Sequence, residues 1–393
     1  MTAPQQPARG ERKAFGHARL GDFLLAPDIL HLNHGGYGAP PRSVLAAAQE
    51  WRERMEADPT TFFRELGPHL RRAADRVAVL LGGAGKDWAF VENATAGMNA
   101  IVASLPLAPD DEILCLSQVY NAVANVLRHH CGRSGARLVV VPVPAPFDDP
   151  GRLLEGIASA ITGRTRIAVF DHIASPGAAV LPVREMAAIC REVGVLVAVD
   201  GAHAPGQLAL DAPRLGIDWY VGNLHKWAFA ARGTGVLWCA PERQPALRPT
   251  SISHGLGQGF AAEFDYCGTR DNSPWLAAPA ALDYLDSLGP EAMRAYNNAL
   301  ARDAGELLAA AWRTEVAAAP AFRAAMAAVR LPGGAGGTQA DAGRIARRLN
   351  EEHRITAAIT VLEGGLWIRI SAQIYNEITD YERLAAMGGK LLD

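Results

Sequence analysis

Between residues 88 and 239 the chain alternates between short apolar runs and longer amphipathic stretches. β-Branched and aromatic side chains are frequent in the runs, which is typical of buried strands, and most of the stretches between them repeat apolar residues with helical spacing. The predicted strands cover residues 88–93, 112–116, 137–143, 166–172, 195–200, 218–223 and 234–239. Strands separated largely by helices predict an α/β fold in which a seven-stranded, mostly parallel sheet lies between helices.

The pattern changes after residue 275, where Ala-rich helical stretches lead into a Gly-rich loop, a predicted helix over 340–352 and paired strands around "GGLWIRIS". We therefore expect a large domain over residues 18–275 and a smaller α+β domain over residues 276–393. Residues 1–17 carry Pro and charge with little to bury, so they predict an N-terminal arm.

Composition narrows the classes of function. The net charge of -3, the pI of about 6.4 and the lack of a basic tract with interleaved aromatics argue against a nucleic-acid partner. The first residues lack the apolar centre of a secretory signal, and no uninterrupted apolar run is long enough to span a membrane. The five cysteines are odd in number and lack metal-ligand spacing. We therefore expect a cytoplasmic protein with reduced thiols, no metal and no membrane partner.

Polar residues gather at the carboxyl ends of the predicted strands, where open α/β sheets bind ligands. They are Asn93, Thr95, Tyr120, His172, Ser175, Asp200, His203, Asn223, His225 and Lys226. The apolar run 195–199 ends in Asp200, and the next predicted strand is followed by Lys226. Pyridoxal phosphate needs such a pair, because a carboxylate keeps its pyridine nitrogen protonated and a lysine amine holds its aldehyde as a Schiff base. The spacing therefore predicts pyridoxal 5'-phosphate as the cofactor.

A phosphate dianion fits the turn "VENATAGMN", where the chain passes from a strand to a helix. The free amides from Ala94 onward and the Thr95 hydroxyl suit the phosphate, although an ordinary helix cap would use the same residue types. Asn223 and His225 can add donors, or serve only loop hydrogen bonds. Thr269 in "GTRD" stands near the expected domain junction and could also reach the phosphate.

Other residues are candidates for contacts with the cofactor ring. His203 follows Asp200 by three positions, which favours an imidazole at the phenolic oxygen of the ring. Tyr120 could stack on the ring, although an aromatic residue after a strand is often a core residue. His172 and Ser175 in "DHIASPG" could form the wall beside the ring oxygen.

Arg369 in "LWIRISAQIYN" is the candidate receptor for the α-carboxylate of an amino-acid substrate. A guanidinium binds a carboxylate through two parallel hydrogen bonds, and the apolar neighbours Trp367, Ile368 and Ile370 argue against a surface salt bridge. Asn33 and the Gly-rich turn in "HLNHGGYG" could close the same pocket.

These stretches resemble the class V aminotransferase group of pyridoxal-phosphate enzymes of fold type I, and within it the isopenicillin N epimerase-like family. The resemblance spans nearly the whole chain in the family's order and rests on "LNHGGYGAPPRSV", "FVENATAGMN", "DHIASP", "VDGAHAPGQLALD", "GNLHKW", "GTRDNSPWLA" and "LWIRISAQIYN". It implies the roles given above for Lys226, Asp200, His203, Thr95, Asn223, His225 and Arg369. It also implies a homodimer with shared active sites, in which Thr269 contributes to the neighbouring subunit.

Two departures from the family's pattern stand out. Where the family commonly shows an acidic residue, histidine, any residue, Tyr and Gly, this chain reads "SQVYN" over 117–121, which leaves the ring-stacking group open. Where the family often reads S-P-T, this chain has Gly177 after Ser175 and Pro176. The glycine predicts extra room beside the ring, suited to a large substrate.

Removal of the Cα proton, with Lys226 as the base, is the step that the resemblance implies for this protein. We favour β-elimination at the C–S bond of an S-substituted cysteine conjugate in specialised metabolism, for example antibiotic biosynthesis. The alternatives are an isopenicillin N epimerase-like epimerase, a decarboxylation-coupled oxidative deaminase and an aminotransferase. A non-catalytic binding protein that retains the fold is a further alternative, against which the intact Asp200 and Lys226 argue.

Overall fold

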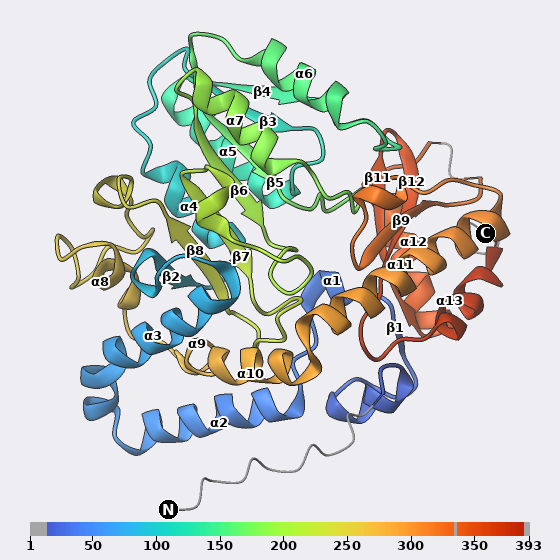
Figure 1. Ribbon diagram of the computed structural model, residues 1–393, viewed down its shortest axis with the longest axis horizontal. Helices are drawn as coiled ribbons and strands as arrows, with labels where there is room; N and C mark the ends of the chain where they lie inside the picture. The colour runs from blue at the N-terminus through green and yellow to red at the C-terminus, as the bar shows by residue number, and fades with distance from the viewer. Residues whose placement is uncertain (1–13, 334–335, 389–393) are drawn as a thin grey trace, which may run out of the picture.

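A computed structural model describes residues 14–333 and 336–388, so most of the arm predicted over residues 1–17 lies outside the described residues. The central sheet has seven strands (Figure 1): β2 (Trp88–Val91), β3 (Glu112–Leu116), β4 (Arg137–Val141), β5 (Thr165–Asp171), β6 (Leu196–Gly201), β7 (Trp219–Asn223) and β8 (Gly235–Cys239). Their order is β2-β8-β7-β6-β5-β3-β4, and β8 runs antiparallel to both of its neighbours. The predicted mostly parallel sheet of seven strands is therefore confirmed.

Alternate residues of the strands enter two separate hydrophobic clusters, one on each face of the sheet. Leu114 and Phe170 pack on one face, whereas Ile113 and Val169 pack on the other. The helices around the sheet are α2 (Arg42–Ala57), α3 (Pro59–Leu81), α4 (Ala94–Ala103), α5 (Asn121–Ser134), α6 (Pro150–Ala160), α7 (Val183–Glu192), α8 (Phe260–Asp265), α9 (Ser273–Leu276) and α10 (Ala278–Leu288). Burial on both faces explains why these strands read as nearly continuous apolar runs.

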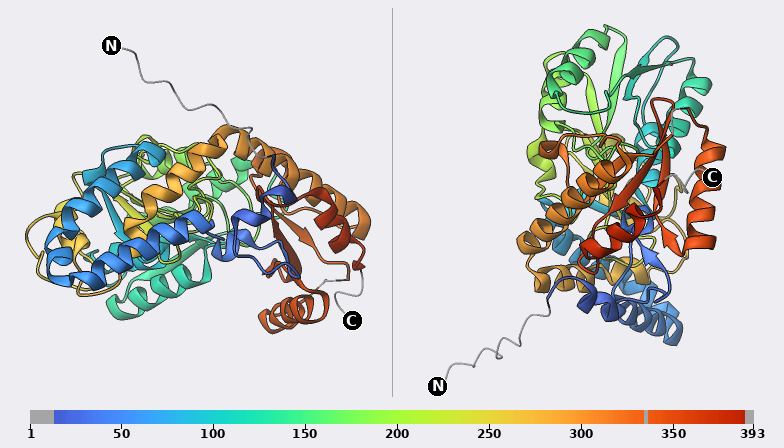
Figure 2. Two further views of the ribbon diagram at one scale, coloured as in Figure 1. Left: turned by 90° about the horizontal axis from the view of Figure 1, so that it is seen from below. Right: turned by 90° about the vertical axis from the view of Figure 1, so that its right-hand side faces the viewer.

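The C-terminal part forms a helix-and-antiparallel-sheet module at one end of the molecule (Figure 2). Its strands are β9 (Met326–Arg330), β11 (Ala358–Leu362) and β12 (Gly365–Ser371), in the order β11-β12-β9, and its helices are α11 (Pro290–Trp312), α12 (Gln339–His353) and α13 (Ile378–Ala385). The helix expected over residues 340–352 and the paired strands around "GGLWIRIS" are both present.

The segment before the central sheet also contacts this module. Strand β1 (Leu30–His31) pairs in parallel with β10 (Ile355–Thr356), and the four-residue helix α1 (His34–Tyr37) follows. Short 3₁₀ turns cover His17–Asp22, Gly85–Asp87, Ala212–Leu215, Gln244–Ala246 and Pro320–Phe322. The division into domains at residues 18–275 and 276–393 stays a prediction. No helix within the described ranges is long and apolar enough to cross a membrane.

Candidate active site

A cavity of about 400 Å³ opens where β5, β6 and β7 end and where α4 and α5 begin. Its wall consists of Gly36, Tyr37, Asn93, Ala94, Thr95, Tyr120, Asp171, Ile173, Ser175, Asp200, Ala202, His203, Asn223, His225 and Lys226. Of the residues predicted to contact the cofactor, all but Thr269 and His172 lie in this wall. The volume is within the range of small-molecule pockets, roughly 300–1,000 Å³.

Lys226 follows the end of β7 and points its amine toward His203, with 3.4 Å between Nζ and Nε2. No carboxylate of the described residues lies within salt-bridge distance of this amine. Burial, together with the nearby charge of Arg369, lowers the pKa of Lys226 from 10.5 to about 8, against the opposing effect of Asp200. A substantial fraction of the amine is therefore neutral near physiological pH, as a nucleophile or a base requires.

Lysine is rare in this chain, which has only Lys13, Lys86, Lys226 and Lys390. Lys86 is exposed, and Lys13 and Lys390 lie outside the described residues. Arginine supplies almost all of the positive charge of this chain. The scarcity of lysine is therefore a further sequence signal that Lys226 has a function.

Two buried carboxyl groups stand side by side at the ends of β5 and β6. Asp200 is 3% exposed, and its Oδ1 accepts a hydrogen bond of 2.9 Å from the Ala202 backbone N–H. Asp171, which is 2% exposed, is paired with Asp200 in the register of the two strands. Burial raises the pKa of both, and the charge of Asp200 raises the pKa of Asp171 further, whereas Lys226 lowers the pKa of Asp200.

Asp171 was not among the predicted site residues. The signal that identified Asp200, a carboxylate at the end of an apolar strand, is present in "IAVFD" as well. The neighbouring His172 is not in the cavity wall. Its side chain points away from the cavity, and its Nδ1 is 3.0 Å from the Tyr220 hydroxyl. Successive residues of a strand face opposite sides, so only one of Asp171 and His172 can reach the cavity.

His203 lies between Lys226 and Trp227. The Trp227 indole N–H donates to Nδ1 of His203 over 3.5 Å, which leaves the proton of the neutral ring on Nε2. Burial, and then the charges of Lys226 and Arg369, lower the pKa of His203 well below 6.5, so the ring is neutral. It presents an N–H donor toward the cavity.

At the start of α4, side chains already satisfy two of the free amides. Asn223 Oδ1 accepts the Ala94 N–H over 2.8 Å, and Asn93 Oδ1 accepts the Ala96 N–H over 2.9 Å, so the helix does have an ordinary cap. The amide and hydroxyl of Thr95 have no hydrogen-bond partner in the parts of the chain that the structure covers. Thr95 therefore keeps both of its donors for a ligand.

His225 donates from Nδ1 to the Thr234 carbonyl over 3.0 Å. Burial, followed by the charge of Lys226, lowers its pKa to about 4, so the neutral ring presents Nε2 as an acceptor. Donation from His225 to a phosphate requires a second proton, which a nearby dianion would favour.

Arg369 lies on β12, is 4% exposed, and reaches the cavity wall through Ser175. Its Nη1 donates to the Ser175 carbonyl over 2.7 Å and to the Ser175 hydroxyl over 2.9 Å. Burial lowers its pKa to about 10, so it is still a cation at neutral pH. Its Nε is buried without a hydrogen-bond partner among the described residues.

Asn33 and Thr269 also lie outside the wall, as His172 and Arg369 do. Asn33 precedes α1, and its Oδ1 is buried without a hydrogen-bond partner in the described part of the chain, whereas the neighbouring Gly36 and Tyr37 do line the cavity. Thr269 is exposed, and its hydroxyl is 3.3 Å from the Tyr266 hydroxyl.

The extra room predicted beside Gly177 is filled by another residue. A Cβ on Gly177 would lie 2.5 Å from Oε1 of the buried Gln118, so the glycine accommodates that side chain. The two departures from the family's pattern are therefore in contact with each other, and the expectation of space for a large substrate at this point is wrong.

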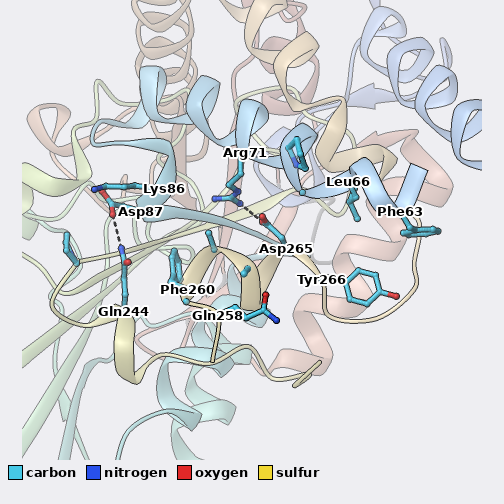
Figure 3. A pocket seen from close by; sticks show the side chains of 16 residues that line it. Phe63, Leu66, Arg71, Lys86, Asp87, Gln244, Gln258, Phe260, Asp265 and Tyr266 are labelled. Carbon is cyan, nitrogen blue, oxygen red and sulfur yellow. Dashed lines mark hydrogen bonds and ion pairs between the residues drawn. The ribbon is translucent and has the colours of Figure 1, made fainter. Parts of the chain in front are cut away.

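A larger cavity of about 750 Å³ lies between α3 and α8 (Figure 3). Phe63, Phe260 and Tyr266 supply apolar wall, and Arg71 forms an ion pair with Asp265. Burial raises the pKa of Asp265 to about 6 despite the opposing effect of Arg71.

The cavity at the ends of β5 to β7 fits pyridoxal phosphate. It offers an amine with a lowered pKa, a buried acid beside it, two unused donors at a helix start and an orphaned buried oxygen, Oδ2 of Asp171. Such an array of unpaired groups is expected where a polar ligand supplies the missing partners.

Comparison with known proteins supports this assignment. The family described as "Aminotransferase class-V" matches residues 37–384. An isopenicillin N epimerase from Streptomyces clavuligerus is 35% identical over 93% of this chain and 95% of its own length. A putative L-cysteine desulfhydrase 1 from Oryza sativa subsp. japonica is 31% identical over 93% of this chain and 83% of its own length.

Solved structures establish the fold. The cystine C–S lyase C-DES, in complex with cysteine persulfide, matches with a TM-score of 0.76 at 21% identity over 93% of this chain and 98% of its own. A cysteine desulfurase from Thermococcus onnurineus matches with a TM-score of 0.79 at 16% identity over 94% of this chain and 96% of its own. The predicted fold type I is therefore confirmed.

Proposed function

The chain belongs to the class-V aminotransferase family of pyridoxal-phosphate enzymes, and on that premise we propose that it is a lyase that breaks the C–S bond of an S-substituted cysteine. The observation that carries the proposal is the grouping of an amine, a buried acid and a buried guanidinium around one cavity. Relatives named as L-cysteine desulfhydrases support the choice of reaction.

Bound pyridoxal phosphate supplies an aldehyde for amines and an electron sink for bonds that break at Cα. We place Asp200 against the ring nitrogen, where its negative charge keeps that nitrogen protonated. His203, with its proton on Nε2, donates to the phenolic oxygen of the ring. Tyr120 is also in the cavity wall and remains the proposed stacking residue.

The phosphate lies, in this proposal, at the start of α4. Thr95 donates from its amide and hydroxyl, and Asn223, whose Oδ1 is held by the Ala94 N–H, donates from Nδ2. His225 adds a donor when the charge of the dianion brings a second proton onto its ring.

The substrate's α-carboxylate binds to Arg369, with the Ser175 hydroxyl beside it. Asn33 lies outside the cavity wall, next to α1, whose Gly36 and Tyr37 do line the cavity, and we keep it as a proposed contact of the substrate. Holding the carboxylate in this way directs the Cα–H bond toward Lys226.

Lys226 then acts as the base, because its lowered pKa makes the neutral amine available. Its Nζ takes the Cα proton, the electron pair of the Cα–H bond forms the new carbon–carbon double bond, and the sulfur leaves with the C–S bonding pair. Protonation of the sulfur gives a thiol, and hydrolysis of the remaining fragment gives pyruvate and ammonia.

Epimerisation is the second candidate, supported by the relative that is 35% identical. It needs a proton donor on the face of Cα opposite Lys226, and the half-exposed Tyr120 in the cavity wall is the candidate for that role. Transamination would break the same Cα–H bond and return the proton to the cofactor instead of to Cα, whereas oxidative decarboxylation would break the bond from Cα to the carboxylate.

We further propose a cytoplasmic homodimer with shared active sites. Thr269 is exposed and lies outside the cavity of its own chain, which supports a role at the neighbouring subunit's phosphate. Mixed dimers of Lys226→Ala and Thr269→Ala subunits test this, because one of their two sites has both groups intact and should recover activity. Failure to recover, with subunit exchange verified, would refute sharing.

The reaction is tested by incubating the protein with a panel of S-substituted cysteines in deuterium oxide and analysing the products by mass spectrometry and chiral chromatography. A thiol with pyruvate and ammonia is the expected result. Inverted substrate with deuterium at Cα and no thiol would replace the lyase with the epimerase, and carbon dioxide with oxygen uptake would indicate the oxidase. Absence of a yellow cofactor after reconstitution would favour a binding protein.

A further inference from the structure

The carboxyl groups of Asp171 and Asp200 are a pair that the mechanism above uses only in part. The two residues are opposite each other on parallel strands, which lie about 4.7–4.9 Å apart, and both side chains line the same cavity. Both are almost fully buried. Two carboxylates so placed cannot both stay ionised at low cost, since each destabilises the charge of the other.

The surroundings of the pair favour the negative charge on Asp200. Oδ1 of Asp200 accepts the Ala202 N–H, and the amine of Lys226 also favours its charge. For Asp171, the backbone N–H of Tyr120 at the start of α5 and its own backbone N–H favour the charge, but burial and the charge of Asp200 outweigh them, and its Oδ2 is buried with no hydrogen-bond partner among the described residues. From β3, the buried thiol of Cys115 faces it with a pKa raised to about 12, so this group is neutral.

We propose that Asp171 is a positioning residue that keeps a proton and donates it, as an O–H···O hydrogen bond, to the ionised carboxylate of Asp200. The proposal rests on the proposed function, in which Asp200 faces the ring nitrogen of pyridoxal phosphate. The pair then carries one negative charge in total, which matches the one positive charge of a protonated ring nitrogen.

This arrangement has a consequence for the cofactor. A carboxylate that accepts a hydrogen bond is a weaker base, so Asp200 competes less well for the proton of the ring nitrogen. Asp171 thereby favours the ion pair between a protonated ring and Asp200 over a neutral pair in which Asp200 holds the proton. It also fixes the rotation of the Asp200 carboxylate, since one oxygen is then held by Ala202 and the other by Asp171.

Two substitutions of Asp171 separate its possible roles in the cofactor-loaded, full-length protein. Asp171→Asn keeps the shape and an N–H donor but can never be charged, whereas Asp171→Leu has a similar size and no donor. The measurements are the dissociation constant of pyridoxal phosphate and the pH dependence of its absorbance. Infrared spectra of the C=O stretch of protonated carboxyl groups give a third readout.

The expected result is that Asp171→Asn binds the cofactor within about threefold of the wild type with the same absorbance profile, whereas Asp171→Leu binds it at least about tenfold more weakly, which corresponds to roughly 1.4 kcal/mol. The wild type should also show a protonated carboxyl band that shifts in deuterium oxide and is absent from Asp171→Asn. If Asp171→Leu does not fold, the infrared comparison of the wild type with Asp171→Asn decides by itself.

Equal behaviour of the Asn and Leu variants, whether both normal or both impaired, would overturn the proposal, as would a wild type without the carboxyl band. Asp200→Asn is measured in parallel. If Asp200→Asn leaves the absorbance of the cofactor unchanged, the placement of Asp200 at the ring fails, which is a separate failure from that of the role of Asp171.

Discussion

The cavity at the ends of β5 to β7 and the cavity between α3 and α8 both contain ionisable groups that are at least partly buried, but the groups are arranged differently. In the cavity between α3 and α8, Arg71 and Asp265 form an ion pair (Figure 3). Arg71 also donates to the backbone carbonyls of Gly85 and Trp88. In the cavity at the strand ends, the Lys226 amine has no carboxylate within salt-bridge distance among the described residues, and Oδ2 of Asp171 has no partner there.

The comparison shows that the volume of a cavity does not indicate whether it is an active site. The cavity between α3 and α8 is the larger of the two, at about 750 Å³ against about 400 Å³. The charges of an ion pair neutralise each other and hold parts of the fold together. Unpaired buried polar groups, in contrast, cost free energy unless a ligand supplies their partners. The smaller cavity also lies at the carboxyl ends of parallel strands, where α/β sheets bind ligands.

The largest effect is expected from the lysines. Lys226→Ala should reduce turnover of an S-substituted cysteine by about 10²–10⁴-fold while the protein still folds, because the base is lost. Lys86→Ala, in the wall of the larger cavity, should change turnover by less than about twofold, as surface substitutions do. Steady-state assays with circular dichroism as the folding control compare the two, and wild-type turnover in Lys226→Ala would refute the assignment.

The acids provide a second comparison. Asp200→Ala removes the negative charge that keeps the ring nitrogen protonated. We expect the pKa of that nitrogen to fall by about two units, which would correspond to roughly a 100-fold loss of rate. Asp265→Asn breaks the ion pair with Arg71 and should lower thermal stability with the cofactor's absorbance unchanged. An unaltered cofactor absorbance and an unaltered rate in Asp200→Ala would contradict the role of Asp200 at the ring nitrogen, and with it the proposed difference between the two cavities.

Arg369 can be tested against another arginine of the same sheet. Arg369→Lys keeps a cation but loses the two-pronged geometry, so KM should rise by about 10–100-fold with a smaller change in kcat. Arg330→Lys on β9, where the arginine pairs with Glu315 at the surface, is the matched control and should leave both constants nearly unchanged. Equal effects of the two substitutions on KM would argue against Arg369 as the carboxylate receptor.

The lowered pKa of Lys226 predicts how cofactor capture depends on pH. Because the pKa of Lys226 is lowered to about 8, the neutral amine increases about tenfold per unit between pH 6 and 7 and levels off above pH 8. The rate at which cofactor-free protein captures pyridoxal phosphate, followed by stopped-flow absorbance, should have the same profile. A rate that keeps rising to pH 10 would mean that the amine has an ordinary pKa.

The sequence predicted the sheet well because the strands are buried on both faces and therefore stand out as apolar runs. Asp200 and Lys226 were predictable for the same reason, since each follows such a run. Asp171 was missed in favour of His172, because the choice between neighbours depends on which face of β5 meets the cavity. The register of β5 against β6 decides this, and it is a property of the assembled sheet.

The sequence also did not predict contacts between segments that are far apart in the chain. The glycine at position 177 suggested open space, but Gln118, which lies on another connection of the sheet, occupies it. The missing information was the position of a residue on another segment of the chain. The proposed role of Thr269 at a second subunit stays a prediction.

The central claim, that Lys226 holds the cofactor, has one direct test. The protein is reconstituted with pyridoxal phosphate, reduced with borohydride so that the bond between amine and cofactor becomes permanent, digested and mapped by mass spectrometry. With only four lysines in the chain, each can be examined separately. We predict that the added mass lies on the peptide containing Lys226; its appearance instead on Lys13, Lys86 or Lys390 would contradict the account.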